Sequence, residues 1–298
     1  MNQLFKYFLA TRPTFLVITL LGCWIGFLSS SLSVAWSLNS LAVLAVLMIH
    51  ASSNLLNDYF DYLNGTDLIN INRISPFTGG SRFIQDNVFS PGEIFRLSIV
   101  LLALSALIGL YLCYTSTWKL LAIGITGVFF GWSYSAPPLK LMSRGILGEI
   151  AIASAWSLVV IGFSVLQNGQ VNLALIPLAL AYGLMVANIL FLNQIPDIEA
   201  DRNSSKETIA VKTLPHKLWK WYSVIFLSAY ILQAISIFYK QTYISTLITL
   251  VMAPIFIFCA IQLRAFPLDR TKQSWIIPLN IIGVHLYALL ICMGLFWG

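Results

Sequence analysis

Long stretches without a single charged residue constrain this chain more than any other feature. Asp, Glu, Lys and Arg are absent from residues 13–57, 97–118, 120–139, 150–196, 221–239, 241–263 and 273–298. A helix needs about 20 apolar residues to cross a bilayer, so the five shorter stretches hold one crossing each and the two longest hold two each. Only 9% of the 298 residues are charged and 58% are hydrophobic, which excludes a soluble, fibrous or disordered protein.

These stretches predict a bundle of nine transmembrane helices. The two longest break at residues 29–31 and 167–170, which are Ser-Ser-Ser and Gln-Asn-Gly-Gln. None alternates strictly between polar and apolar residues, which argues against an outer-membrane barrel. We therefore expect an all-α, polytopic membrane protein that forms one domain over residues 1–298. The expected helices are 14–34, 38–57, 95–114, 117–134, 148–166, 172–193, 219–239, 243–263 and 275–296.

The basic residues predict the orientation of the bundle. Lys and Arg are retained on the cytoplasmic side, and 15 of the 17 fall in alternate loops if the N-terminus is cytoplasmic, the exceptions being Lys119 and Lys240. The alternation requires an odd number of helices. The net charge of +6 then needs no nucleic acid to explain it. The first 12 residues lack a signal-peptide cleavage pattern, and we expect a multi-pass protein of the plasma membrane.

Cysteine and histidine give no sign of a metal centre or a disulfide. The four cysteines lie in different expected helices, and no two have the spacing of a Cys-x-x-Cys motif. His50, His216 and His285 have no ligating neighbour at helical spacing. Packing in the core is the favoured interpretation of these residues.

The acidic residues gather where two of the expected helices end. Six of the 11 acids lie in the segments 57–67 and 193–201. Both segments follow even-numbered helices, so both are expected on the cytoplasmic face. Asn57 and Asp61 share one helix face, as do Asn193, Asp197 and Asp201, because residues four apart lie above one another.

A hard divalent cation is the simplest partner for such clusters. Carboxylates at a helix C-terminus oppose the helix dipole and repel one another, so an uncompensated cluster is unfavourable. Carboxylate and amide oxygens suit Mg²⁺ rather than zinc. Solvated helix ends are the alternative, which two matching clusters on one side make less favourable.

Basic residues and a glycine pair in the intervening loops point to a diphosphate ligand. The loop after residue 67 carries Arg73 and Gly79-Gly80-Ser81-Arg82, and the segment 134–140 reads Tyr-Ser-Ala-Pro-Pro-Leu-Lys. Arg and Lys neutralise phosphate oxygens, and glycines let backbone N–H groups approach an anion. The glycine pair alone is equally consistent with a simple turn.

The motifs together resemble the UbiA superfamily of intramembrane prenyltransferases, over essentially the whole chain. They are the nine spans, Asn57-Asp58-x-x-Asp61, Asp197-x-x-x-Asp201 and the Tyr-Ser-x-x-Pro-x-Lys stretch that ends at Lys140. The resemblance implies Mg²⁺-dependent transfer of a polyisoprenyl group from its diphosphate to an acceptor that is often aromatic. The menaquinone-pathway branch, which prenylates 1,4-dihydroxy-2-naphthoate, is the most similar. The ubiquinone-type pattern has a third acid at position 65, where this chain has glycine and Asp67 follows two residues later.

The residues and the resemblance together name the candidate site. The expected catalytic residues are Asp58, Asp61, Asp197, Asp201, Lys140 and Tyr134. The expected substrate-binding residues are Asn57, Arg73, Arg82, Asn193, Lys206 and Arg12. The expected metal ligands are Asn57, Asp61, Asp67, Asp197 and Asp201. The expected partners are a polyprenyl diphosphate, an aromatic acceptor and the bilayer.

Two alternatives remain open at this point. The acceptor could be 4-hydroxybenzoate, homogentisate or another quinone or lipid precursor, because no linear motif specifies the pocket that binds it. A secondary transporter is the alternative from another class, with polar residues inside helices as its substrate path. Acids gathered at helix ends on one face, rather than at the bilayer midplane, favour the enzyme.

Overall fold

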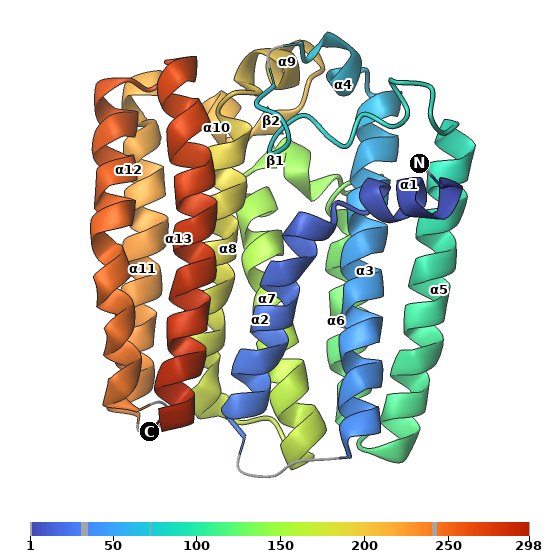
Figure 1. Cartoon of the computed structure of the whole chain (residues 1–298), viewed down its shortest axis with the longest axis vertical. Coiled ribbons are helices and arrows are strands. Elements are labelled where there is room, and N and C mark those ends of the chain that lie inside the picture. The colour runs from blue at the N-terminus through green and yellow to red at the C-terminus, as the bar shows by residue number, and fades with distance from the viewer. Residues whose placement is uncertain (1, 31–34, 72, 240–242, 298) are drawn as a thin grey trace.

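Helices account for almost all of the chain. The computed structural model describes residues 2–30, 35–71, 73–239 and 243–297, and 79% of the structure is helical. Helices satisfy their own backbone hydrogen bonds, as a bilayer interior requires. The long helices stand side by side (Figure 1). They are α2 (Pro13–Leu28), α3 (Trp36–Leu63), α5 (Pro91–Thr115), α6 (Lys119–Ser133), α7 (Leu147–Asn168), α8 (Ile176–Gln194), α11 (Leu218–Phe238), α12 (Ala253–Ala265) and α13 (Arg270–Trp297).

Short elements connect the long helices. Figure 1 shows α4, α9, α10 and the two strands gathered over one end of the bundle. It is the end at which α13 begins. The short helices are α1 (Gln3–Ala10), α4 (Thr66–Ile69), η1 (Leu141–Ser143), η2 (Leu173–Leu175), α9 (Ile198–Asn203), α10 (Ile209–Lys212), η3 (Pro215–Lys217) and η4 (Ile244–Met252). The strands are β1 (Arg144–Gly145) and β2 (Glu207–Thr208).

One short pair of strands is the exception to the expected all-helical fold, which the structure otherwise confirms. β1 and β2 pair in parallel, with Arg144 opposite Glu207 and Gly145 opposite Thr208. Each strand has only two residues, too few to show an alternating pattern in the sequence. The ladder fastens the loop after α6 to the segment after α9.

The bundle consists of helices that are suited to cross a membrane. The expected number of nine crossings and their orientation stay predictions. Within the described ranges, seven helices are long and apolar enough to cross a bilayer. The bent pair α1–α2, with a 60° angle between its parts, raises the number to eight, and α6 is apolar but has only 15 residues. Lys240, one of the two exceptions to the charge alternation, lies outside the described residues.

Several helix boundaries differ from those expected. Helix α3 continues to Leu63 instead of ending at 57, so Asp58 and Asp61 lie on its last turns. The expected helix 243–263 begins as the 3₁₀ segment η4, and α12 starts only at Ala253. Pro254 in the first turn of α12 explains that start, because proline is tolerated there but not in a helix interior.

Small residues let the central helices approach closely. A methyl group added at Gly183 of α8 would lie 2.1 Å from the backbone oxygen of Ala153 in α7. Close contact between backbones is how helices associate where lipid is as apolar as their side chains. Large apolar side chains such as Leu107 and Ile231 remain exposed on the outside of the bundle, as expected of a surface that faces lipid.

Candidate active site

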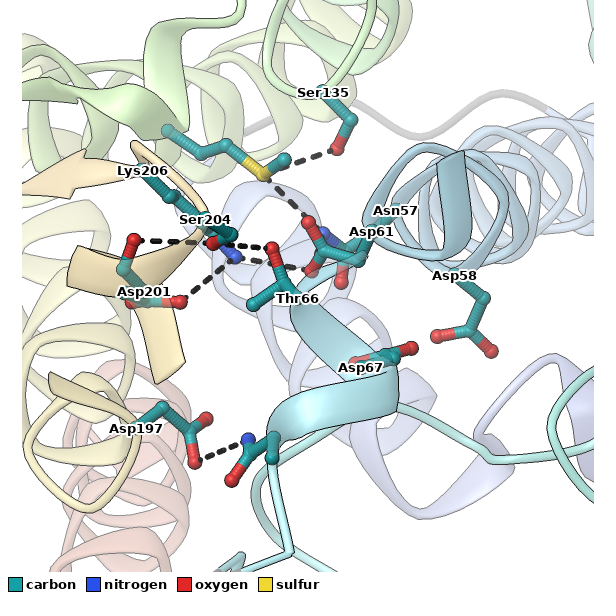
Figure 2. Close-up of polar contacts among 12 residues, drawn as sticks. Asn57, Asp58, Asp61, Thr66, Asp67, Ser135, Asp197, Asp201, Ser204 and Lys206 are labelled. Carbon is teal, nitrogen blue, oxygen red and sulfur yellow. Dashed lines mark hydrogen bonds and ion pairs between the residues drawn. The ribbon is translucent and has the colours of Figure 1, made fainter. Parts of the chain in front are cut away.

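One lysine joins the two acidic segments at the same end of the bundle. Lys206 Nζ lies 3.0 Å from Asp61 Oδ2 and 3.6 Å from Asp201 Oδ1. Asp61 is on the last turns of α3 and Asp201 is on α9. Figure 2 shows the ammonium group between the two carboxylates. The structure therefore brings segments separated by 145 positions into one site.

Asn57 and Asp61 contact each other across one turn of α3, as their spacing predicts. The Asn57 amide donates to Asp61 Oδ2 at 3.2 Å and also contacts the Met142 sulfur at 3.3 Å. The second carboxylate oxygen of Asp61 is buried and makes no hydrogen bond to the described residues. An unpaired buried carboxylate oxygen is costly, so this atom is available for a ligand.

The chain changes direction between Asn193 and Asp197. Helix α8 ends at Gln194, Pro196 follows, and α9 begins at Ile198, because proline ends a helix at the preceding residues. Asp197 lies in this break. Asn193 donates to the backbone oxygen of Phe77 at 3.4 Å, and its own side-chain oxygen is buried without a partner among the described residues.

Asp197 is held by two residues that the sequence analysis missed. Its Oδ1 accepts hydrogen bonds from Asn70 Nδ2 at 2.8 Å and from Thr78 Oγ1 at 3.1 Å. Thr78 directly precedes the Gly79-Gly80 pair, which the sequence analysis did name as a candidate for anion binding. Asn70 follows the short helix α4, and no spacing rule connects it to an acid 127 positions away.

Asp58 has different partners from Asp61, the other acid of α3. It forms an ion pair with Arg12, and both of its oxygens lie 3.3 Å from the backbone N–H of Ser81. Arg12 stands at the bend between α1 and α2 with a positive φ of 56°, which directs its side chain toward the site. Asp58 thus holds both Arg12 and the loop of Gly79, Gly80 and Ser81, which we call the glycine loop.

Asp67 lies on α4 and faces the glycine loop. Its Oδ2 accepts a hydrogen bond from Gln85 at 3.1 Å, and its backbone oxygen accepts one from Arg82. Gly80 has a φ of 73°, and a methyl group there would lie 2.8 Å from Asp67 Oδ2 and 3.1 Å from Asp58 Oδ1. Only glycine combines this conformation with such close approach.

The basic candidates divide into two groups. Arg12 and Lys206 line the cavity described below, whereas Lys140, Arg73 and Arg82 do not. Lys140 Nζ donates to Asn64 Oδ1 at 3.1 Å. The direct roles expected of the second group stay predictions, and the side chain of Arg82 donates instead to the backbone oxygen of Asp67.

Burial makes this cluster electrostatically unusual. It raises the pKa of Asp67 to about 8, with the neighbouring carboxylates Asp61 and Asp58 adding to the effect. It also raises the pKa of Asp201 to about 7, although Lys206 opposes the shift. For Lys206, burial lowers the pKa, but Asp201 and Asp61 more than offset this and the net shift is upward. The site therefore favours bound positive charge.

The donor atoms fit magnesium held jointly with a substrate. Among the described residues, no three acidic, histidine or cysteine side chains converge closely enough to hold an ion on their own. Mg²⁺ is typically bound by one or two carboxylates together with substrate phosphates and water, rather than by a complete protein cage. The free oxygens of Asp61 and Asn193 and the carboxylates of Asp197 and Asp201 would supply such partial ligation if Mg²⁺ bound here with a substrate.

A cavity of about 630 Å³ leads from the acids into the bundle. At the acidic end its lining includes Asn57, Tyr134 and the acids Asp61, Asp67, Asp197 and Asp201. Deeper, the lining is mostly apolar and includes Val46, Phe130, Trp156 and Phe163. Leu110 of α5 and Ile125 of α6 line the cavity and are also 49% and 62% exposed, so the cavity reaches the lipid-facing surface between these helices.

Comparison with known proteins gives a family match over nearly the whole chain. The model of the UbiA prenyltransferase family matches residues 15–291. A relative named 1,4-dihydroxy-2-naphthoate octaprenyltransferase, from Bacillus subtilis, is 29% identical over 167 residues, which are 55% of this chain and 51% of the relative. The chain thus matches about half the length of that relative. UbiA prenyltransferase domain-containing protein 1 from Xenopus tropicalis is 26% identical over 98% of this chain and 80% of its own.

A solved structure shares the fold. A UbiA homolog from Archaeoglobus fulgidus, bound to GPP and Mg²⁺, superposes with a TM-score of 0.64 at 17% sequence identity. The superposition covers 97% of this chain and 99% of the homolog. At this identity the likeness establishes the arrangement of helices and nothing finer.

Proposed function

Because the chain belongs to the UbiA prenyltransferase family, we propose that it transfers a polyisoprenyl group from its diphosphate to an aromatic acceptor in the membrane, with Mg²⁺ as cofactor. One observation carries the proposal. The two acidic segments meet around Lys206 at the mouth of an apolar cavity that reaches the lipid-facing surface. A diphosphate needs the charged mouth, and its isoprenoid tail needs the apolar interior.

The charged end binds the diphosphate in this mechanism. Asp61, Asp197 and Asp201, with the amide oxygens of Asn57 and Asn193, would hold Mg²⁺, which neutralises diphosphate charge and supplies Lewis acidity. Lys206 and Arg12 add fixed positive charge beside the leaving group. Such preorganised charge stabilises the negative charge that develops as the bond between the prenyl carbon and oxygen breaks.

The apolar part of the cavity protects the reacting carbon. An allylic cation forms as the diphosphate leaves, and water would quench it, so exclusion of water is essential. Tyr134 and the other aromatic rings of the wall stabilise a cation by about 0.5–2 kcal/mol each. The new carbon–carbon bond forms from the acceptor ring, which then loses a proton, or loses its carboxylate as CO₂.

We further propose 1,4-dihydroxy-2-naphthoate as the acceptor, which would place the reaction in menaquinone biosynthesis. The support is the motif pattern around Asp58 and Asp201 and the name of the Bacillus subtilis relative. Mass spectrometry of the products from a panel of aromatic acceptors tests this choice. 4-Hydroxybenzoate and homogentisate are the main competitors.

Substitution of the acids tests the proposed reaction. We expect Asp61→Asn and Asp197→Asn to abolish the transfer of label from a prenyl diphosphate, because each removes a charge that holds the metal and diphosphate. Asp86→Asn is the matched control and should retain wild-type activity, since Asp86 is exposed in the segment between α4 and α5. EDTA should stop transfer and Mg²⁺ should restore it.

Two outcomes would contradict the proposal. Near-wild-type transfer by both acidic variants would remove the two-cluster site. Uptake of a labelled substrate into vesicles without any covalent product would instead indicate a transporter.

A further inference from the structure

His50 is a polar side chain in the cavity wall that the mechanism above does not use. It lies on α3, four residues before Asn54 and seven before Asn57, so the three side chains share one helix face. All three line the cavity. At 1.5 Å per residue, His50 stands about 10 Å deeper along the helix than Asn57.

Three helices fix the orientation of the His50 ring. Its Nδ1 is 2.7 Å from Oγ1 of Thr19, a residue of α2 that is only 1% exposed. Its edge contacts the ring of Trp156 of α7, with 4.9 Å between centroids and an interplanar angle of 86°. A hydroxyl and an indole from two other helices therefore leave the imidazole little freedom to rotate.

The second ring nitrogen is without a hydrogen-bond partner among the described residues. Nε2 makes no hydrogen bond to any residue that the structure describes, and it is not fully buried. The side chains that line the cavity near this level include Ala45, Val46 and Ile49, which offer no polar group. Nε2 is thus open to a molecule in the cavity, and a polar group of a ligand is the expected partner.

An isoprenoid tail cannot supply that group, because it is a hydrocarbon. The aromatic acceptor can, because it carries ring hydroxyls. If the diphosphate binds at the level of Asn57, as the proposed function has it, the reacting prenyl carbon would lie near Asn54, one helical turn from His50. An acceptor ring placed to attack that carbon spans the remaining turn of about 5.4 Å.

We propose that His50 binds a ring hydroxyl of the acceptor and thereby selects hydroxylated rings. In this arrangement Nδ1–H donates to Thr19, and Nε2 accepts from the acceptor hydroxyl. The contact is a hydrogen bond without proton transfer. Thr19 is a positioning residue, because its hydroxyl holds the Nδ1 side of the ring in place. The inference rests on the proposed function, because it assigns the acceptor to this cavity.

Equilibrium binding to the purified full chain in nanodiscs tests the inference. The probes are 1,4-dihydroxy-2-naphthoate and 2-naphthoate, which has the same ring and carboxylate without the hydroxyls. We expect the wild type to bind the dihydroxy compound about tenfold more tightly, the ratio that one hydrogen bond provides. In His50→Leu this preference should disappear. In His50→Gln, which keeps a hydrogen-bonding group, and in Thr19→Val it should fall only in part.

Two further measurements separate a binding role from a structural one. Binding of geranyl diphosphate with Mg²⁺ should be the same in His50→Leu as in the wild type, which also shows that the variant is folded. His216→Leu, the same substitution at an exposed position, should leave the preference for hydroxyls intact.

The outcomes distinguish this inference from the proposed function. An undiminished preference in both His50→Leu and His50→Gln overturns the inference, even if the wild type makes prenylated product. Loss of the preference in His50→Leu, together with no product from the wild type and any aromatic acceptor, overturns the proposed reaction and supports the binding site.

Discussion

At the residue scale, Lys206 is the side chain that links the two acidic segments of the site. Its ammonium group lies between Asp61 and Asp201, and its side chain is 14% exposed. Buried charges are tolerated only when they are paired, so Lys206 makes two neighbouring carboxylates compatible with folding before any substrate arrives. In the proposed reaction, the same charge would attract the diphosphate.

Replacement of Lys206 should therefore harm both stability and activity. We expect Lys206→Met to lower the free energy of unfolding by about 3 kcal/mol, the order found when one partner of a buried ion pair is removed, and to reduce prenyl transfer strongly. Denaturant unfolding in detergent and the transfer assay measure the two effects. Lys212→Met is the control, because the ion pair of Lys212 with Glu207 is exposed. Equal stability of the two variants would contradict this role of Lys206.

Binding of the metal should depend on pH. The raised pKa values of Asp67, about 8, and Asp201, about 7, mean that the folded protein keeps protons that the unfolded chain releases near pH 4. The metal-free protein should thus lose stability as the pH rises from about 4 to 8. Mg²⁺ held at Asp201 together with a diphosphate competes with the Asp201 proton and disfavours that of the neighbouring Asp67, so the rise in melting temperature on adding Mg²⁺ with geranyl diphosphate should be larger at pH 8 than at pH 6. An equal rise at both values would contradict the assignment.

At the scale of single elements, helix ends and breaks determine what the site contains. Helix α3 extends past its charge-free stretch and carries Asn57 and Asp61 into the site on adjacent turns. Pro196 ends α8 and leaves Asp197 in a short break, where Asn70 and Thr78 hold its carboxylate. The acids of the first segment thus lie on one continuous helix, whereas those of the second lie in and after a break between two helices.

The close contact of α7 and α8 provides a test of packing at this scale. We expect Gly183→Ala to destabilise the bundle, because the added methyl group would lie 2.1 Å from the backbone oxygen of Ala153 and the helices would have to separate. Gly92→Ala in α5 is the matched control, since nothing lies within 4 Å of the added methyl group and alanine favours helix. Thermal unfolding in detergent should show a lower midpoint for the first variant only.

At the scale of the whole molecule, the site lies at one end of the bundle and the cavity runs inward from it. Exposed tryptophans such as Trp36, Trp118 and Trp297 lie at or beside the ends of long helices. Aromatic residues in that position are typical of the interface between lipid and water. The ends of the bundle, one of which holds the site, are thus expected at the two membrane surfaces.

The orientation of the bundle can be tested by labelling. Arg202 is exposed beside the acids on α9, and Leu173 is 73% exposed in η2, at the other end of α8. We expect Arg202→Cys to react with a membrane-impermeant thiol reagent only from the cytoplasmic side, and Leu173→Cys only from the opposite side, because basic loops stay inside. Cys23, Cys113 and Cys259 are buried and should give little background. The reverse pattern would contradict the expected orientation.

The sequence by itself determined the class of fold and the segments that gather the acidic residues. Charge-free stretches specify membrane helices because a charge inside lipid is costly, and the spacing of Asn57 and Asp61 specifies a shared face because helical geometry is local. The family resemblance was also legible, since its motifs are continuous in the chain, and the family match confirmed it.

Only the tertiary structure decided which side chains meet. Lys206 between Asp61 and Asp201, Asn70 on Asp197, and Thr19 on His50 are contacts between distant segments, and no local pattern encodes them. The same is true of Lys140, which binds Asn64 instead of lining the cavity. Local periodicity fixes the face on which a side chain lies, whereas its partner depends on how whole helices pack, a property of the assembled bundle.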